Sequence, residues 1–182
     1  MTKVRLIPFL RDDLDVLFVG LNPSVESNDN GHYFSGKWSR FFHLLYLSGL
    51  ITCEVDKSAA DEIVFGTNEV NYNNAQFGVV DLVPEVVESN SAMVKPKDHD
   101  VQKLLSTIRR FEPRFVCVIH AKAQGTINRL KASEIIGKIE LGSFNNILRD
   151  CKSTFIFNYF PNGNNKPDVL KLRIFRQLRD VL

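Results

Sequence analysis

The stretch VLFVGLNPSVESNDNGHYFSGKWSRFFHLL, residues 16–45, joins three different local patterns. It begins with an apolar run rich in β-branched residues, which is typical of a strand buried on both faces. The run ends in the sequence GLNPS, and a polar loop that carries His32, Tyr33 and Phe34 follows. Aromatic residues at helical spacing come next, so the stretch predicts a buried strand, a loop and a helix.

The rest of the chain continues this alternation of strands and helices. Apolar runs predict strands at residues 14–22, 77–83, 114–120, 153–160 and, more weakly, 138–142. Amphipathic patterns predict helices at residues 38–50, 98–111, 121–130 and 166–182, and a short one at 58–66. The alternation favours one α/β domain over residues 1–182, a three-layer αβα fold around a mainly parallel sheet of about four to five strands.

Two of the predicted helices have side chains whose environment can be anticipated. Trp38, Phe41, Phe42 and Leu45 recur at i, i+3, i+4 and i+7, which places Trp38 on the apolar face of the helix at 38–50. The basic residues of the last helix are expected to form a solvated face; they are Lys171, Arg173, Arg176 and Arg179.

Composition excludes several classes of protein. The chain has 182 residues, 44% of them hydrophobic and 24% charged, with a net charge of +2, which is ordinary for a globular domain and gives no polybasic tail. The apolar runs are too short to span a membrane, and the N-terminus has no signal-peptide pattern. The 3 cysteines include no CxxC pair, so we expect no disulfide framework, no metal and no cofactor, and a cytoplasmic location.

Polar residues follow the predicted strands at the point where each strand ends. These are Asn22, Asp81, His120 and the loop FPNGNN at 160–165. Because ligands bind at the carboxyl ends of the strands in parallel α/β folds, all four are candidate site positions.

Several motifs resemble those of the uracil-DNA glycosylase superfamily, in particular its mismatch-specific uracil and thymine-DNA glycosylases. The first motif of that family is similar to GLNPS at 20–24, GHYFSG at 31–36, RFF at 40–42 and LSGL at 47–50. Later blocks of the family are similar to GVVDLV at 78–83, KPKD at 95–98 and IRRFEPRFVCVIHAKA at 108–123. The likeness extends over residues 14–170.

The resemblance implies a monofunctional glycosylase that hydrolyses the bond between a base, uracil first of all, and deoxyribose in base excision repair. Its partner would be double-stranded DNA with a damaged or mismatched base, and the protein would act as a monomer on nucleoid DNA. Such an enzyme must flip the base out, stabilise negative charge on it and place a water under the sugar C1′. Asn22 would orient that water, because a carboxamide is not a general base at neutral pH. Faster relatives have Asp at this position, so a slow enzyme is expected.

The resemblance also assigns binding roles. Phe34 would stack on the flipped base, while His32, Asp81 and the backbone N–H near Leu21 would contact its polar edge. The residues expected to contact DNA are Lys95, Pro161, Gly163, Asn164 and Lys166.

Four positions depart from the family pattern, one of them His120, which stands near a Gly of the family. Ser39 stands where the family prefers Asn, and Asn162 where it has a small Ser. Asp81 stands where relatives have Lys or Asn, and an ionised carboxylate is an acceptor only. Asp81 would therefore suit a base edge with N–H donors, such as N3–H of uracil or N1–H of hypoxanthine, which keeps hypoxanthine or xanthine as an alternative substrate.

Each of these residues also has a purely structural interpretation. Asn22 before Pro23 is a common turn pair, and Phe34 would fit a core. His32 fits a surface loop, Asp81 a paired strand-end carboxylate, and Asn162-Gly163 a simple turn.

Two other functions stay open. One is a catalytically idle relative that binds DNA without cleaving it, which the altered second motif at 160–166 suggests. The other is a small-molecule α/β enzyme that shares only the strand–loop–helix unit. A glycosylase requires Asn22, Phe34 and the 160–166 loop to converge on one pocket.

Overall fold

The architecture was analysed in a computed structural model that describes residues 3, 6–131, 133–144, 146–162 and 166–182. A six-stranded sheet in the order β2-β1-β3-β6-β5-β4 forms its centre. The four neighbours β2 (Phe77–Asp81), β1 (Val16–Gly20), β3 (Phe115–Val118) and β6 (Thr154–Phe157) are parallel. The short strands β5 (Ile147–Leu148) and β4 (Ile135–Ile136) add an antiparallel edge. The predicted α/β class and mainly parallel sheet are confirmed. The sheet has six strands where about four to five were expected, because the two-residue strands β5 and β4 are too short to show as apolar runs in the sequence.

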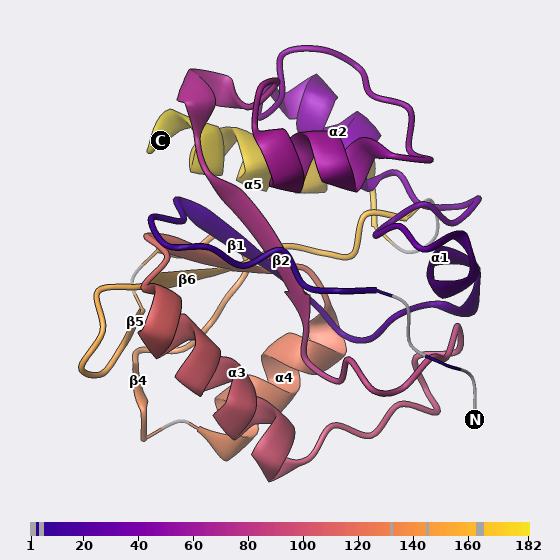
Figure 1. Cartoon of the computed structure of the whole chain (residues 1–182). Coiled ribbons are helices and arrows are strands. Elements are labelled where there is room, and N and C mark those ends of the chain that lie inside the picture. The colour runs from indigo at the N-terminus through magenta and orange to yellow at the C-terminus, as the bar shows by residue number, and fades with distance from the viewer. Residues whose placement is uncertain (1–2, 4–5, 132, 145, 163–165) are drawn as a thin grey trace.

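Helices cover both faces of the sheet (Figure 1). One face carries α2 (Phe41–Ser48), the π-helix η1 (Glu62–Thr67) and α5 (Asp168–Asp180), and the other carries α3 (Asp98–Phe111) and α4 (Ala121–Leu130). Alternate residues of β1 serve the two cores: Val16 and Phe18 pack on the α2–α5 side, while Leu17 and Val19 pack on the α3–α4 side. A strand buried on both faces therefore needs the continuous apolar run that opens the quoted stretch.

The loops after the parallel strands gather at one edge of the sheet, beside the short helix α1 (Val25–Asn30) (Figure 1). A short 3-10 turn, η2 (Tyr72–Asn74), precedes β2. No helix among the described residues is both long and apolar enough to cross a membrane.

The weak strand expected at 138–142 does not form. The backbone N–H and C=O of Ile139 bond instead to the side chain of Asn128 in α4, at 3.0 and 2.9 Å, and Gln124 also donates to that C=O at 2.6 Å. Only Leu141 bridges to the sheet, at Phe157. The side chains of Asn128 and Gln124 thus take the hydrogen bonds of the Ile139 backbone that a neighbouring strand would otherwise make.

The helix predicted from residue 38 begins at Phe41, and Trp38 lies outside it with 71% of its surface exposed. The backbone before the helix is used elsewhere: the Arg40 N–H donates to the C=O of Pro161 at 2.8 Å, and Ser39 forms a β-bridge with Asn162. The prediction that Trp38 packs on the apolar face was wrong, because a long-range contact with the second loop claims the residues before the helix.

Lys171 is not on a solvated face either. Its side chain is fully buried, and its Nζ donates to the C=O of Asn162 at 2.6 Å and pairs with Asp168 at 3.4 Å. Asp168 also pairs with Arg40 at 2.5 Å. These charges hold the loop after β6 against the start of α2.

Candidate active site

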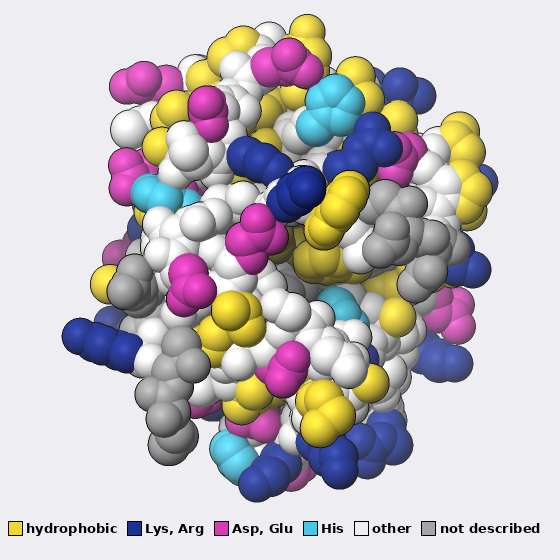
Figure 2. Space-filling view, turned by 90° about the vertical axis from the view of Figure 1, so that its right-hand side faces the viewer, with side chains coloured by type: hydrophobic (Ala, Val, Ile, Leu, Met, Phe, Trp, Pro, Cys, Tyr) yellow, Lys and Arg dark blue, Asp and Glu magenta, His cyan; other side chains and the backbone are white. Residues whose placement is uncertain are grey.

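A pocket of about 300 Å³ opens at the carboxyl edge of the sheet. Figure 2 looks onto this side of the molecule and shows a hollow near its centre. Three adjacent strands each bring one polar side chain to the pocket: Asn22 follows β1, Asp81 ends β2, and His120 follows β3. These strand-end residues lie together because β2 and β3 both pair with β1, and Phe160 and Asn162 of the loop after β6 line the same pocket.

Hydrogen bonds from its amide nitrogen to the backbone hold the side chain of Asn22 in one orientation. Its Nδ2 lies 2.9 Å from the C=O of Pro23, 3.0 Å from that of Val86 and 2.8 Å from that of Glu88. Three carbonyls around one atom identify it as the nitrogen. The Oδ1 then remains as an acceptor at a residue that lines the pocket, and it has no hydrogen bond from any described residue. This arrangement suits the binding of a water molecule.

Asp81 is a buried carboxylate without a hydrogen-bond partner among the described residues. It is 6% exposed, and burial raises its pKa to about 7. A buried charge is retained only where something offsets the lost hydration. Since Asp81 lines the pocket, a ligand with N–H or O–H donors would supply that compensation.

Gly20 makes room for Asp81. The two residues are directly paired across β1 and β2, and a Cβ on Gly20 would lie 2.2 Å from the Asp81 Oδ1. The carboxylate can occupy this position only because residue 20 has no side chain.

Gly20→Ala is therefore expected to displace the Asp81 carboxylate. We expect a loss of stability of about 1–3 kcal/mol and a fall of about 10- to 100-fold in the rate of the reaction that this pocket carries out. Denaturant unfolding and single-turnover assays would measure both. The matched control is Gly125→Ala in α4, where nothing lies within 4 Å of the added Cβ, so stability should rise slightly. Wild-type activity in Gly20→Ala would show that the position of Asp81 is unimportant.

His120 is a neutral imidazole with a defined tautomer. Its Nδ1 accepts the backbone N–H of Lys122 at 3.1 Å, at the start of α4, so the ring proton resides on Nε2. Burial first, and then the charge of Lys122, lower the pKa of His120 to about 4. The pocket therefore contains a neutral N–H donor at physiological pH.

Aromatic side chains complete the pocket. Phe34 has φ 56°, a left-handed conformation that is costly for an aromatic residue, and it stacks on Phe41 with 4.1 Å between ring centroids. Phe160 lies 5.7 Å from the ring of His120. Burial, followed by the charges of Asp81 and Asp61, raises the pKa of Tyr33 and keeps its hydroxyl protonated.

A family model for the uracil DNA glycosylase superfamily matches residues 7–172 of the chain. The chain belongs to this superfamily. Membership identifies a hydrolytic DNA glycosylase that acts on DNA in DNA repair, and it agrees with the resemblance seen in the motifs. It leaves the branch of the superfamily and the preferred base open.

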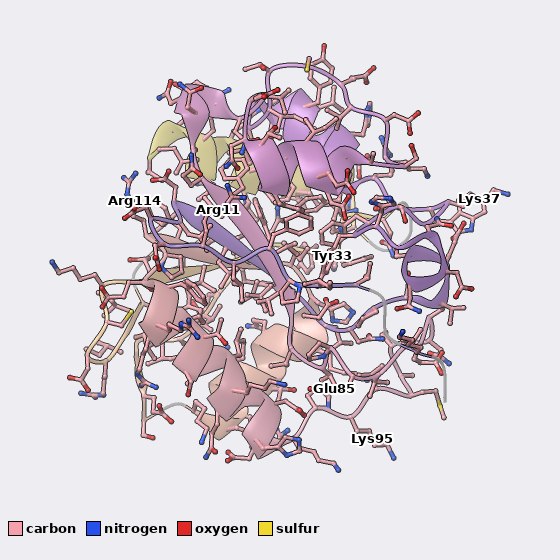
Figure 3. All side chains as sticks on the ribbon, in the orientation of Figure 1. Arg11, Tyr33, Lys37, Glu85, Lys95 and Arg114 are labelled. Carbon is pink, nitrogen blue, oxygen red and sulfur yellow. The ribbon has the colours of Figure 1, made fainter. Side chains whose placement is uncertain are left out.

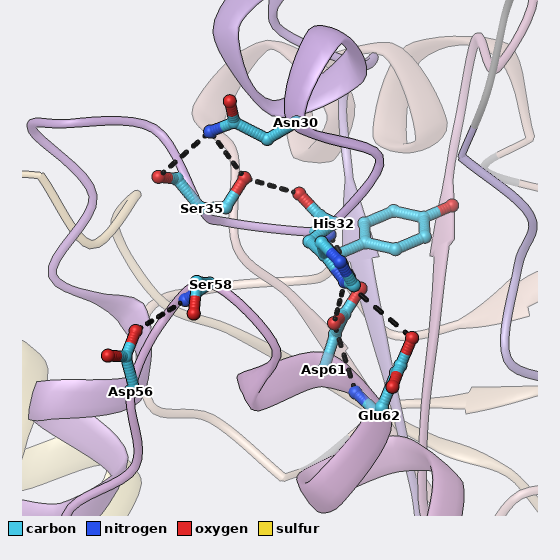
Figure 4. A network of polar contacts seen from close by, with 8 residues as sticks. Asn30, His32, Ser35, Asp56, Ser58, Asp61 and Glu62 are labelled. Atoms are coloured by element: carbon cyan, nitrogen blue, oxygen red, sulfur yellow. Dashed lines mark hydrogen bonds and ion pairs between the residues drawn. The ribbon is translucent and has the colours of Figure 1, made fainter.

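Two of the base-binding residues that the superfamily motifs suggest line the pocket together with Asn22 and Asp81. They are Leu21 and Phe34, both buried. His32 does not line it. The His32 Nδ1 instead lies 2.9 Å from Asp61, which also accepts the N–H of Tyr33 at 2.7 Å (Figure 4). The structure thus gives His32 a place in the network that anchors the Tyr33–Phe34 loop.

None of the predicted DNA contacts that are described lies in the pocket. Lys95 is exposed on the loop after β2 (Figure 3), and Pro161 is buried. Lys166 lies with its Nζ 5.2 Å from the ring centre of Tyr159. Gly163 and Asn164 lie outside the described residues.

The sequence reasoning missed the residues that position the second loop. Lys171 and Asp168 are three residues apart in α5, a spacing that signals an ion pair, but their burial depends on the distant Asn162 and Arg40. Tyr33 was also missed as a pocket residue, whereas Phe160 belongs to the 160–165 loop that the sequence proposed for the site. Among the described residues, no group of three or more His, Cys, Asp and Glu side chains could hold a metal ion.

Proposed function

We propose that this glycosylase is monofunctional and releases a deaminated or mismatched base, uracil first of all, from a nucleotide flipped out of double-stranded DNA. The orientation of Asn22 carries the proposal, because three carbonyls on Nδ2 leave Oδ1 to position a water. We also propose that the protein acts as a monomer in the cytosol. The three free cysteines are compatible with this compartment.

In the proposed reaction, the glycosidic bond breaks with its electron pair moving to the base. The water on Asn22 Oδ1 adds to C1′ and releases its proton to solvent, since the carboxamide does not accept it. The neutral His120 donates a hydrogen bond from its Nε2–H to the base, which leaves as the anion, and His120 keeps its proton. Phe34 supplies an apolar face for the base, and Asp81 accepts an N–H from its edge.

Asp81 also favours a second candidate, a glycosylase for hypoxanthine or xanthine. A lone carboxylate at the pocket matches the N1–H of hypoxanthine as well as the N3–H of uracil. Only a direct comparison of substrates separates the two.

The test is a base-release panel. Purified protein is incubated with duplex and single-stranded oligonucleotides that contain uracil, a G·T mismatch, hypoxanthine or xanthine, and abasic sites are then cleaved with alkali. We expect cleavage at uracil in the duplex, at a rate about 100-fold or more lower in Asn22→Ala. Preferential cleavage at hypoxanthine would favour the second candidate, and repeating the panel with Asp81→Asn would show whether the carboxylate selects the base. Binding of lesion DNA without release of any base would support a catalytically idle relative.

A further inference from the structure

Trp38 is the most conspicuous apolar side chain at the mouth of the pocket. It is the one Trp of the chain, it lines the pocket, and 71% of its surface is exposed. The ring contributes to neither core, so packing does not account for a large aromatic side chain at this position. A large aromatic side chain held in water at a site is a strong indication of a binding contact.

The backbone on both sides of Trp38 is anchored. Lys57 donates its Nζ to the C=O of Gly36 at 3.0 Å and to that of Lys37 at 2.9 Å. On the other side, the Ser39 N–H donates to Gly36 at 2.9 Å and the Arg40 N–H to Pro161 at 2.8 Å. The protein therefore presents the indole from a fixed position, which lowers the entropic cost of binding.

The surroundings of Trp38 are positively charged. The Lys37 Nζ lies 5.0 Å from the centre of the indole ring, and Lys57 lies under the same loop. A group of Lys and Arg side chains lies directly above the rim of the hollow in Figure 2, although Asp and Glu side chains are also spread over this face. Figure 3 shows Lys37 projecting outward. Glu26 and Glu88 line the pocket itself, so phosphates are favoured on the lysine side.

An exposed aromatic ring between lysines has the chemistry of a nucleic-acid contact. Nucleobases stack on indole rings whatever their sequence, while ammonium groups meet the adjacent phosphates. A protein partner would instead call for a contiguous apolar patch around the ring, whereas the flanking side chains here are Lys37 and Ser39.

We infer that Trp38 stacks on the nucleobase adjacent to the flipped nucleotide, with Lys37 at the neighbouring phosphate. When a base leaves the duplex, the faces of its neighbours lose their stacking partner, and an indole at the pocket mouth replaces it. The inference rests on the proposed function, since it takes lesion-containing DNA as the occupant. It adds a contact from the loop before α2 to those expected from the loop after β6.

The single Trp provides a direct test, because all tryptophan emission comes from this residue. The protein is titrated with a duplex that contains a tetrahydrofuran abasic analogue, which needs no catalysis. We expect strong quenching of the emission and reduced access of acrylamide, with much smaller changes for an undamaged duplex. Unchanged emission and acrylamide access on a duplex that is shown to bind would overturn the inference.

Variants test the energetic contribution. Trp38→Ala is expected to weaken binding of the abasic duplex by roughly 5- to 150-fold, the range for loss of one stacked base. Trp38→Phe should retain most of the affinity. The control is Ile136→Ala in β4, an apolar residue that is 50% exposed and outside the pocket. Equal affinity of Trp38→Ala and Ile136→Ala would contradict the inference.

The two proposals can fail separately. Release of uracil by a protein whose emission does not respond to DNA would reject the role of Trp38 and leave the glycosylase assignment intact. Quenching by the abasic duplex without release of any base would support the role of Trp38 and reject the catalytic assignment.

Discussion

Asn22→Ala is expected to lower the single-turnover rate of base release by about 100-fold or more. The variant removes the acceptor that positions the attacking water, while the aromatic walls that hold the base remain. Binding of an abasic duplex should change much less than the rate, because Asn22 is proposed to act on water. Single-turnover assays with saturating protein would separate the two effects.

Asn22→Asp tests the orientation of the amide more directly than Asn22→Ala does. It would place a carboxylate oxygen where Nδ2 now faces the carbonyls of Pro23, Val86 and Glu88. Three hydrogen bonds would become repulsive contacts, so we expect a loss of stability of about 1–3 kcal/mol and a low rate, even though Asp occupies this position in faster relatives. A variant at least as active as the wild type would show that the amide orientation does not matter.

The matched control is Asn128→Ala. Asn128 also bonds to the backbone, at Ile139, but lies outside the pocket. Its loss should lower stability and leave the base-release rate of the folded protein unchanged.

Asp81→Asn is expected to stabilise the protein, and the gain should depend strongly on pH. Burial raises the pKa of Asp81 from an ordinary value of 3.8 to about 7, so the folded state holds the proton more tightly than the unfolded state. The contribution of Asp81 to stability is therefore fully present below pH 4 and is lost as pH rises toward 7. At pH 8 the cost of the ionised carboxylate is on the order of 4 kcal/mol.

The measurement is the free energy of unfolding of wild type and Asp81→Asn from pH 4 to pH 8. The difference between the two proteins should be small at pH 4 and reach several kcal/mol at pH 8, because the amide does not titrate. Asp12→Asn, at an exposed position, controls for the loss of one negative charge. A difference that stays constant across this range would mean that Asp81 finds a partner in solution. If the difference does grow with pH, the wild type loses stability because it keeps a carboxylate in the pocket for the N–H donors of a ligand. Such a loss of stability is common at functional sites.

Local patterns in the sequence were sufficient for most of the architecture. Continuous apolar runs are typical of strands buried on both faces, and the 98–111 and 121–130 helices were predicted with the observed bounds. The convergence of Asn22, Asp81 and His120 followed from the same patterns, because carboxyl ends of parallel strands meet at one edge. The motifs around Asn22 were sufficient to indicate the superfamily, which the family match over 7–172 then showed.

Only the tertiary structure decided how individual side chains are used. His32 binds Asp61, which lies 29 residues away in sequence. Lys171 is buried because Asn162 and Asp168 satisfy its charge, and Trp38 is left in water because the residues after it pair with the loop after β6. Spacing along one helix or strand reports which face a residue occupies, but it contains no information about a partner on another element. The sequence by itself thus determined the four parallel strands, the layers and the location of the pocket. The long-range packing decided the antiparallel edge of the sheet, the orientation of Asn22, the isolation of Asp81 and the exposure of Trp38.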